Sequence, residues 1–192
     1  MNGNAIDLVE RYARTWTTLL QYDEDRLVLP EGTPSTGALD HESALADVDL
    51  LARHLMHKGE TTDLFGRERG DGALDGILGG IEQTMFGEPL YGSAQEKAAN
   101  LLYLVIKDHP FVDGNKRIGS FLFLRYTQTQ RIPVTIPPEA LTTLALLVAQ
   151  SDPSDKDRMI RLAMAVMNPD PHAGETAGPE SDNGSPQPGA PR

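Results

Sequence analysis

Apolar side chains recur at helical spacing through nearly the whole of this 192-residue chain. Spacings of three and four residues place such side chains on one face of a helix, whereas a strand would alternate them. A stripe near the start consists of Ile6, Val9, Ala13, Trp16 and Leu20. It predicts an amphipathic helix of about five turns, and we expect its apolar face to pack in a core. The pattern predicts an all-α fold.

The same spacing predicts six further helices, separated by segments rich in Gly and Pro. Their expected ranges are 40–58, 74–85, 94–108, 118–129, 139–150 and 159–166. Glycines at 76, 79 and 80 interrupt the second of these ranges, and we expect them to allow close contact with a neighbouring helix. Ser93 and Glu96 form a capping box that opens the next helix, and Pro110 ends it.

One segment breaks the helical pattern with two glycines and a proline, which predicts a short hairpin or an extended flap. Its residues are Phe86, Gly87, Glu88, Pro89, Leu90, Tyr91 and Gly92. The stretch 168–192 holds six prolines, four glycines and no aliphatic residue larger than Ala. Such a segment cannot bury enough surface to offset its ordering entropy, so we expect a disordered tail. The length suits one domain over residues 1–167, with its core at 74–130.

The formal net charge is −11, from 17 Lys and Arg against 28 Asp and Glu. Generic nucleic-acid binding relies on clustered cations that neutralise phosphates, so this balance argues against it. No stretch has the apolar length of a membrane helix, and the start lacks the features of a secretory signal. The absence of cysteine fits a reducing compartment. We therefore expect a cytoplasmic protein with no membrane or generic nucleic-acid partner.

Nine residues between two predicted helices combine several reactive groups, in the order His-Pro-Phe-Val-Asp-Gly-Asn-Lys-Arg at 109–117. Backbone N–H groups left free at a helix N-terminus attract anions, and the helix dipole adds to that attraction. Lys116 and Arg117 stand at that end, against an acidic background. The run therefore indicates a site for a phosphorylated ligand.

Within the run, His109 can take a proton from an incoming hydroxyl as a neutral imidazole. Asp113 offers a hard oxygen ligand for magnesium. Phe111 is expected to anchor the loop on the core.

The following residues complete the predicted phosphate site. Gly114 permits a backbone conformation closed to other residues, and Asn115 can hold the loop or contact a phosphate. Lys116 supplies a compact charge, and Arg117 supplies a planar fork for paired phosphate oxygens.

The run resembles the signature of the Fic/Doc (Fido) family, His-x-Phe-x-Asp/Glu-Gly/Ala-Asn-Lys/Gly-Arg, at every constrained position. Residues 22–27, 58–67 and 92–123 are also similar to Fic/Doc proteins of the RhuM-associated type. The resemblance implies an all-α Fido bundle, a magnesium–nucleotide cofactor such as ATP, and transfer to a Ser, Thr or Tyr hydroxyl of a protein.

Carried over by position, the resemblance implies that His109 is the general base and Asp113 the magnesium ligand. Asn115, Lys116 and Arg117 would bind phosphates together with the Gly114 backbone. Residues 86–92 would be the flap that aligns the target segment.

Lys116 bears on which group is transferred. Adenylylating members usually have Gly at this position, whereas Doc-type toxins have Lys, and there the resemblance implies a reversed nucleotide that donates its γ-phosphate. A side chain that fills the inner-phosphate nest fits that reversal. Because Pro110 and Gly114 are more similar to the adenylylating branch, phosphoryl transfer is favoured only narrowly over adenylylation.

Other functions stay open at this point. The chain could be a Fido scaffold that binds a nucleotide or a partner without catalysis. A metal-dependent hydrolase is weakly supported by His41, His54 and His57, of which the last two fit a solvated helix surface better. No good match to the family's inhibitory Ser/Thr-x-x-x-Glu-Gly/Asn helix precedes residue 168, so an antitoxin-like partner is a hypothesis for control. Helix-mediated dimers are plausible for this architecture.

Overall fold

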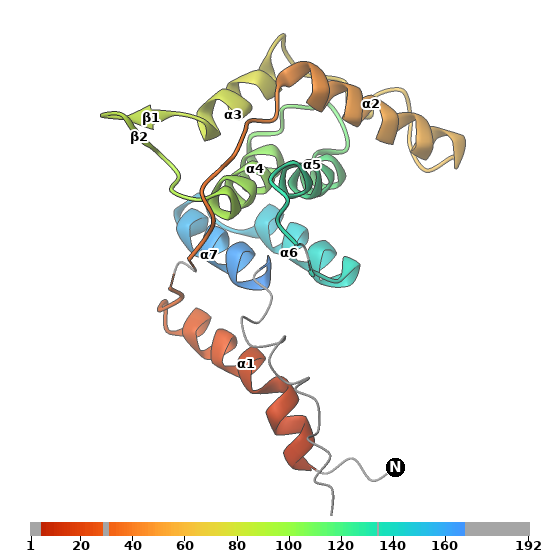
Figure 1. The fold of residues 1–192 in the computed structure, drawn as a ribbon. Coiled ribbons are helices and arrows are strands. Elements are labelled where there is room, and N and C mark those ends of the chain that lie inside the picture. Colours follow the sequence, from red (N-terminus) through yellow and green to blue (C-terminus); the bar gives the residue numbers. More distant parts are fainter. Residues whose placement is uncertain (1–4, 29–30, 134, 168–192) are drawn as a thin grey trace, which may run out of the picture.

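The computed structural model describes residues 5–28, 31–133 and 135–167, and these ranges confirm the all-α prediction (Figure 1). The helices are α1 (Ala5–Asp23), α2 (His41–His57), α3 (Ala73–Ile81), α4 (Ala94–Asp108), α5 (Asn115–Thr129), α6 (Pro138–Gln150) and α7 (Lys156–Met167), with a 3₁₀ turn at Pro153–Asp155. The predicted hairpin is present as antiparallel strands β1 (Thr84–Met85) and β2 (Glu88–Pro89). The predicted disordered tail lies outside the described residues.

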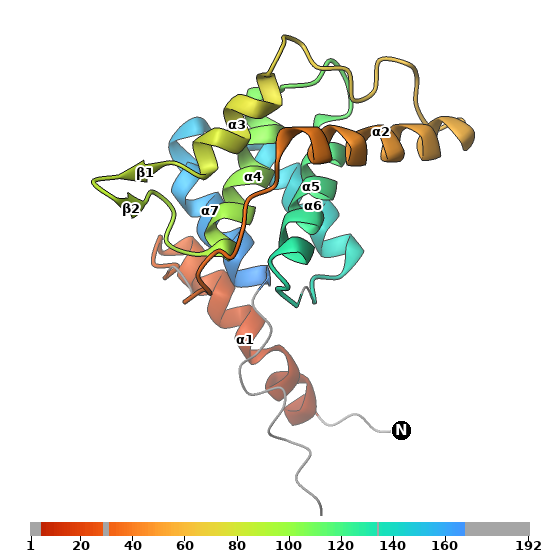
Figure 2. The same cartoon turned by 45° about the horizontal axis from the view of Figure 1, so that its top comes forward.

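Helix α4 forms the centre of the bundle and packs against α3, α5, α6 and α7 (Figures 1 and 2). Ten of its side chains are buried, including Lys97 and Asn100. Its start follows the capping box, because the Ser93 side chain accepts a hydrogen bond from the Glu96 backbone N–H. Glu96 in turn accepts from the backbone N–H of Gly92 at 2.8 Å, so the cap also fixes the end of the hairpin segment.

Hydrogen bonds from two buried residues connect the segment before the hairpin to the bundle. Glu82, which directly follows α3, accepts hydrogen bonds from Lys97 Nζ at 2.5 Å and from the Tyr126 hydroxyl at 3.2 Å. Lys97 and Tyr126 are buried on α4 and α5. A buried ammonium needs a partner of opposite charge, and Glu82 supplies it. These contacts hold Glu82 in place, and with it the start of the hairpin two residues later.

The loop before α2 crosses the end of α5. Gln130 accepts a hydrogen bond from the backbone N–H of Thr36 at 2.8 Å and donates one to the carbonyl of Gly37 at 2.7 Å. Ser35 also lies 3.1 Å from the Tyr126 hydroxyl. These bonds position Asp40, whose side chain caps α2 by accepting from the backbone N–H of Ser43.

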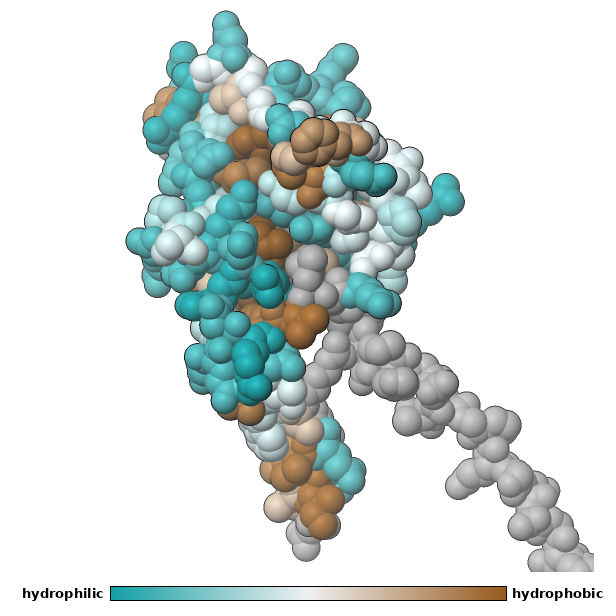
Figure 3. Space-filling model, turned by 90° about the vertical axis from the view of Figure 1, so that its left-hand side faces the viewer, coloured by the Kyte–Doolittle hydropathy of each residue, from teal (hydrophilic) through white to brown (hydrophobic). Residues whose placement is uncertain are grey.

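The prediction that the first apolar stripe packs in the core is wrong. Val9, Trp16 and Leu20 are each about half exposed, and α1 projects from the bundle (Figure 1). The space-filling view shows hydrophobic residues at the surface of this projecting part (Figure 3). Helical periodicity identified the helix correctly, but periodicity cannot say what covers its apolar face.

Three further expectations are corrected. Met85 belongs to β1 and is exposed rather than helical. Gly76, Gly79 and Gly80 make no close helix contact, because a Cβ added at any of them would meet nothing within 4 Å. The helix after the motif begins at Asn115 instead of residue 118, so the motif itself provides its first turn.

Because the Tyr126 hydroxyl is buried, the free energy of unfolding should fall at alkaline pH. Burial raises its pKa to about 12 from an ordinary value of 10.0. The unfolded chain therefore loses this proton first, and stability present below pH 10 is lost as the pH rises toward 12, by on the order of 2 kcal/mol. Denaturant unfolding across this range should show the loss. Tyr126→Phe should be less stable at neutral pH and should show a smaller fall, and an equal fall in both proteins would contradict the assignment.

Candidate functional site

The motif loop is held in place by a backbone pairing with residues 65–69. The N–H of Arg69 donates to the carbonyl of Pro110 at 2.8 Å, and the N–H of Val112 donates to the carbonyl of Arg67 at 2.8 Å. The N–H of Gly66 donates to the carbonyl of Asp113 at 3.2 Å. The sequence reasoning missed this partner, because a Gly-rich, charged loop carries no spacing signal that links it to the motif.

Asn115 closes the loop on itself. Its Oδ1 accepts from the backbone N–H of Phe111 at 3.0 Å, and its Nδ2 donates to the carbonyl of Phe111 at 2.8 Å. Both residues are buried, and Phe111 is fully so, as expected of an anchor. Of the two roles considered for the Asn115 amide, the structure shows it holding the loop.

Gly114 is required by both its conformation and its surroundings. Its φ is +90°, and a Cβ at this position would lie 2.3 Å from Cε2 of Phe65. Only glycine allows the aromatic ring to pack this closely while the chain turns into α5. Phe65, which is itself buried, thus presses the loop against the start of the helix.

His109 ends α4 in the left-handed conformation, with φ of 52°. Positive φ is uncommon for a residue other than glycine and is concentrated at functional sites. Its Nδ1 lies 3.0 Å from the carbonyl oxygen of Lys107. Because a carbonyl can only accept, Nδ1 carries the proton, and the neutral ring has its lone pair on Nε2. The side chain is exposed and able to meet a ligand.

A cavity of about 320 Å³ lies over the start of α5. Its lining residues are Arg69, His109, Val112, Asp113, Gly114, Asn115, Lys116 and Arg117. The structure therefore brings together every polar residue singled out in the motif, and it adds Arg69. The Arg69 Nε donates to the carbonyl of Phe111 at 3.1 Å, which directs a third cation to the site.

Arg117 is held by three neighbours. Its guanidinium lies 4.6 Å from the centre of the Phe65 ring. Nη1 donates to the carbonyl of Glu60 at 3.2 Å, and Nη2 lies 3.8 Å from Oδ2 of Asp113. A guanidinium has five N–H donors, so donors remain for a ligand. Asp113 is half exposed, which leaves its carboxylate open to a cation from solvent.

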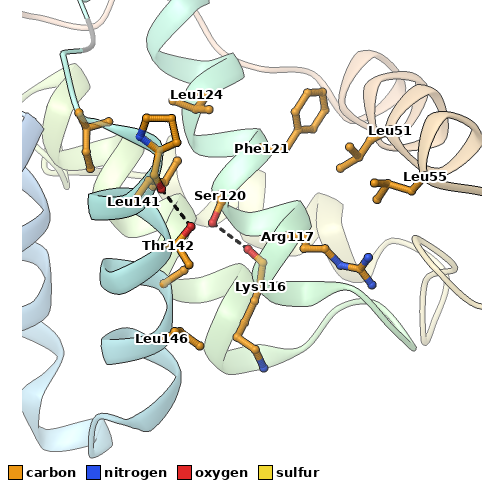
Figure 4. Close-up of a pocket in the computed structure, with 13 residues that line it drawn as sticks. Leu51, Leu55, Lys116, Arg117, Ser120, Phe121, Leu124, Leu141, Thr142 and Leu146 are labelled. Atoms are coloured by element: carbon orange, nitrogen blue, oxygen red, sulfur yellow. Dashed lines mark hydrogen bonds between the residues drawn. The ribbon is translucent and has the colours of Figure 1, made fainter. Parts of the chain in front are cut away.

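A larger apolar cavity of about 560 Å³ begins at the same end of α5. Lys116 and Arg117 lie at its edge, and side chains of α2, α5 and α6 form its walls (Figure 4). Labelled apolar residues are Leu51, Leu55, Phe121, Leu124, Leu141 and Leu146. Ser120 donates a hydrogen bond to the carbonyl of Lys116 at 2.9 Å and so is occupied within the helix.

The hairpin presents its tip to solvent. Phe86 and Gly87 form the turn, both with positive φ, and Phe86 is 100% exposed. Between α3 and the end of α4, a cavity of about 370 Å³ is lined by Gly76 and Gly80 of α3 together with His109.

Among the described residues, His41, His54 and His57 belong to no group of three metal ligands. His54 and His57 are exposed on α2, which confirms the solvated-surface interpretation. Across the ranges that the structure describes, no three His, Asp or Glu side chains converge as metal ligands. Within the same ranges, no helix has the length and apolarity needed to cross a membrane.

Comparison with known families gives a match to part of the chain. Residues 42–127 match the model of the Fic/DOC family, and this range runs from the first turn of α2 to near the end of α5. It includes the pairing segment, the hairpin and the whole motif. Among curated proteins and among solved structures, none matches the chain significantly.

Gly114→Ala should damage the site through the fold. The left-handed φ and the overlap with Phe65 together should lower the free energy of unfolding by about 2–4 kcal/mol. Denaturant unfolding measures this loss. Gly79→Ala is the matched control, since its Cβ meets open space on a helix and should stabilise by up to about 1 kcal/mol. A Gly114→Ala protein as stable as the wild type would contradict the packing argument.

Proposed function

Because the chain belongs to the Fic/DOC family, we propose that its site uses a nucleoside triphosphate and magnesium to modify a Ser, Thr or Tyr hydroxyl of a target protein. Proteins of this family generally use a nucleotide and Mg²⁺. The observation that carries the proposal is the His109 ring, oriented by Lys107 at the edge of a cavity that three cations line.

The residues present fit a magnesium-bound triphosphate. The first N–H groups of α5 have no partner within the helix, and Lys116, Arg117 and Arg69 add positive charge beside them. Asp113 supplies one hard oxygen, and magnesium commonly takes one or two carboxylates while phosphates and water complete its coordination. When bound, the ion would offset the negative charge of the phosphates.

The chain's own groups then account for the chemistry. His109 Nε2 accepts the proton of the target hydroxyl as that oxygen attacks phosphorus and the bond from phosphorus to the bridging oxygen breaks, so a nucleoside diphosphate leaves after attack at the γ-phosphorus and pyrophosphate leaves after attack at the α-phosphorus. The α5 N–H groups and the guanidiniums hold the phosphate oxygens and stabilise charge that develops on them. The loop is already fixed by Asn115 and Phe65, so little reorganisation accompanies the reaction. The exposed hairpin at 86–92 would align the target segment by strand pairing.

Phosphoryl transfer from the γ-position is the reaction we favour. Lys116 occupies the second position of α5 and lines the phosphate cavity, where its side chain takes space beside the helix N-terminus. Adenylylation by the same groups is the alternative, and a nucleotide-binding scaffold without catalysis is the second. Since the sequence up to residue 167 holds no good match to the family's inhibitory helix, we also propose control by a separate antitoxin-like partner.

Labelled nucleotides test the reaction. Purified protein, magnesium, cell lysate and ATP labelled at the α- or γ-phosphate should give protein-bound label from γ-ATP alone. His109→Ala should reduce labelling about 10²-fold or more. His57→Ala, on the exposed end of α2, should leave it unchanged. Label from α-ATP would replace phosphoryl transfer with adenylylation, and equal labelling by wild type and His109→Ala would favour the scaffold.

Arg69 should contribute to nucleotide binding. Arg69→Gln removes the charge but keeps an N–H that can reach Phe111, so we expect the KM for nucleotide to rise about tenfold with a smaller change in kcat. Arg67→Gln is the control, because that exposed neighbour lines a different cavity, away from His109. Equal kinetics for the two variants would remove Arg69 from the site.

A further inference from the structure

The projecting helix α1 carries a continuous apolar stripe on its surface. Six of its large side chains, each 46–56% exposed, are Leu8, Val9, Tyr12, Trp16, Leu19 and Leu20, and Ile6, which is 58% exposed, borders them near the start of the helix. At 100° per residue these positions span about 120° of the helix surface, which is the width of a packing face. Tyr12 and Trp16 also contact each other, with ring centroids 6.5 Å apart.

The bundle holds α1 by its C-terminal end. Arg158 of α7 stacks over the Tyr22 ring at 5.6 Å and donates to Asp25 at 3.1 Å, and Arg161 donates to the carbonyl of Leu27 at 2.8 Å. The half-buried residues of α1 are Thr18, Gln21 and Tyr22, which lie on the side opposite the stripe. The contacts with the bundle therefore leave the apolar stripe uncovered, and Figure 3 shows hydrophobic residues at the surface of the projecting helix.

The stripe is symmetric about position 14. Leu8 and Leu20 lie six positions on either side of it, Val9 and Leu19 lie five, and Tyr12 and Trp16 lie two. In an antiparallel pair of identical helices that cross at position 14, Leu8 of one copy is level with Leu20 of the other. Val9 is likewise level with Leu19, and Tyr12 is level with Trp16. A twofold interface requires this self-complementarity. We propose that α1 pairs antiparallel with α1 of a second copy of this chain.

The exposed area is sufficient for a dimer. At about half of roughly 200 Å² for each large side chain, six residues offer about 600 Å² per copy. Complete burial of this area in two copies gives about 1,200 Å², the lower end of the range of specific interfaces. The tyrosine and tryptophan pairs at the centre are the residue types that dominate binding energy.

Charge favours a second copy over a membrane surface. In the antiparallel pairing, Asp7 is level with Gln21 and Glu10 is level with Thr18, all four outside the apolar stripe, so no two acidic residues meet. Helices that bind anionic lipid carry a polar face rich in Lys and Arg. Outside the stripe, α1 has Arg11 and Arg14 in its sequence as well as Asp7 and Glu10, so it carries no excess of cations, and the chain has a net charge of −11.

Sedimentation of the full chain tests the proposal, which does not depend on the proposed activity. The wild type should have twice the chain mass at micromolar concentrations. Trp16→Asp should weaken association about tenfold or more, because it places a charge in the apolar seam. Thr17→Asp is the matched control on the neighbouring exposed position outside the stripe and should stay dimeric. A monomeric wild type, or a Trp16→Asp protein that associates as tightly as the wild type, would overturn the pairing.

Disulfide cross-linking tests the register of the two helices. Because the chain has no native cysteine, any covalent dimer must form through the introduced cysteines. Chains with Leu8→Cys alone or Leu20→Cys alone should not form covalent dimers under mild oxidation. An equal mixture of the two should, because position 8 faces position 20 only in the antiparallel arrangement. Cross-linking within either single variant would indicate a parallel pair and overturn the proposal. So would a monomer that binds lipid vesicles through the stripe.

Discussion

The backbone pairing between residues 65–69 and the motif loop is the constraint on which the site depends. Without it, His109, Asp113 and Arg117 would belong to a surface connection between two helices. The pairing sets the course of the loop, and the Asn115 amide then fixes its interior. Phe65 links the two, because the same ring packs on Gly114 and supports the Arg117 guanidinium. The geometry of the cations thus follows from packing as much as from charge.

Helix α5 explains why positive charge gathers here in an acidic protein. Its N-terminus is formed by the motif, so backbone N–H groups and the Lys116 and Arg117 side chains point to one small region. Asp113 lies 3.8 Å from Arg117 and partly balances this charge. A ligand with several negative charges and a bound divalent cation matches both kinds of group: the N–H groups and cations at the start of α5 attract its negative charges, and the Asp113 carboxylate attracts the divalent cation. A single anion would leave the carboxylate facing it.

The sequence predicted the helices and the motif well, for physical reasons that are local. Capping at Asp40 and Ser93, the glycine after α2 and the hairpin turn each depend on neighbouring residues alone. Arg69 and Phe65 were missed because their role arises from pairing between distant segments. The glycines of α3 were interpreted as contact points, yet none has a neighbour within 4 Å of an added Cβ, and Gly76 and Gly80 line a cavity. Spacing identifies a face of a helix but not its neighbour.

The same limit applies to α1, whose stripe is as regular as those of the core helices. Its exposure becomes intelligible when the neighbour is another copy of the chain. In Figures 1 and 2, α1 leaves the bundle beside α7, whereas the motif lies at the opposite end of α4. Pairing through α1 would therefore keep both motifs open and add no residue to either. Its effect on function would come from two sites carried together, which raises the apparent affinity for paired or clustered targets.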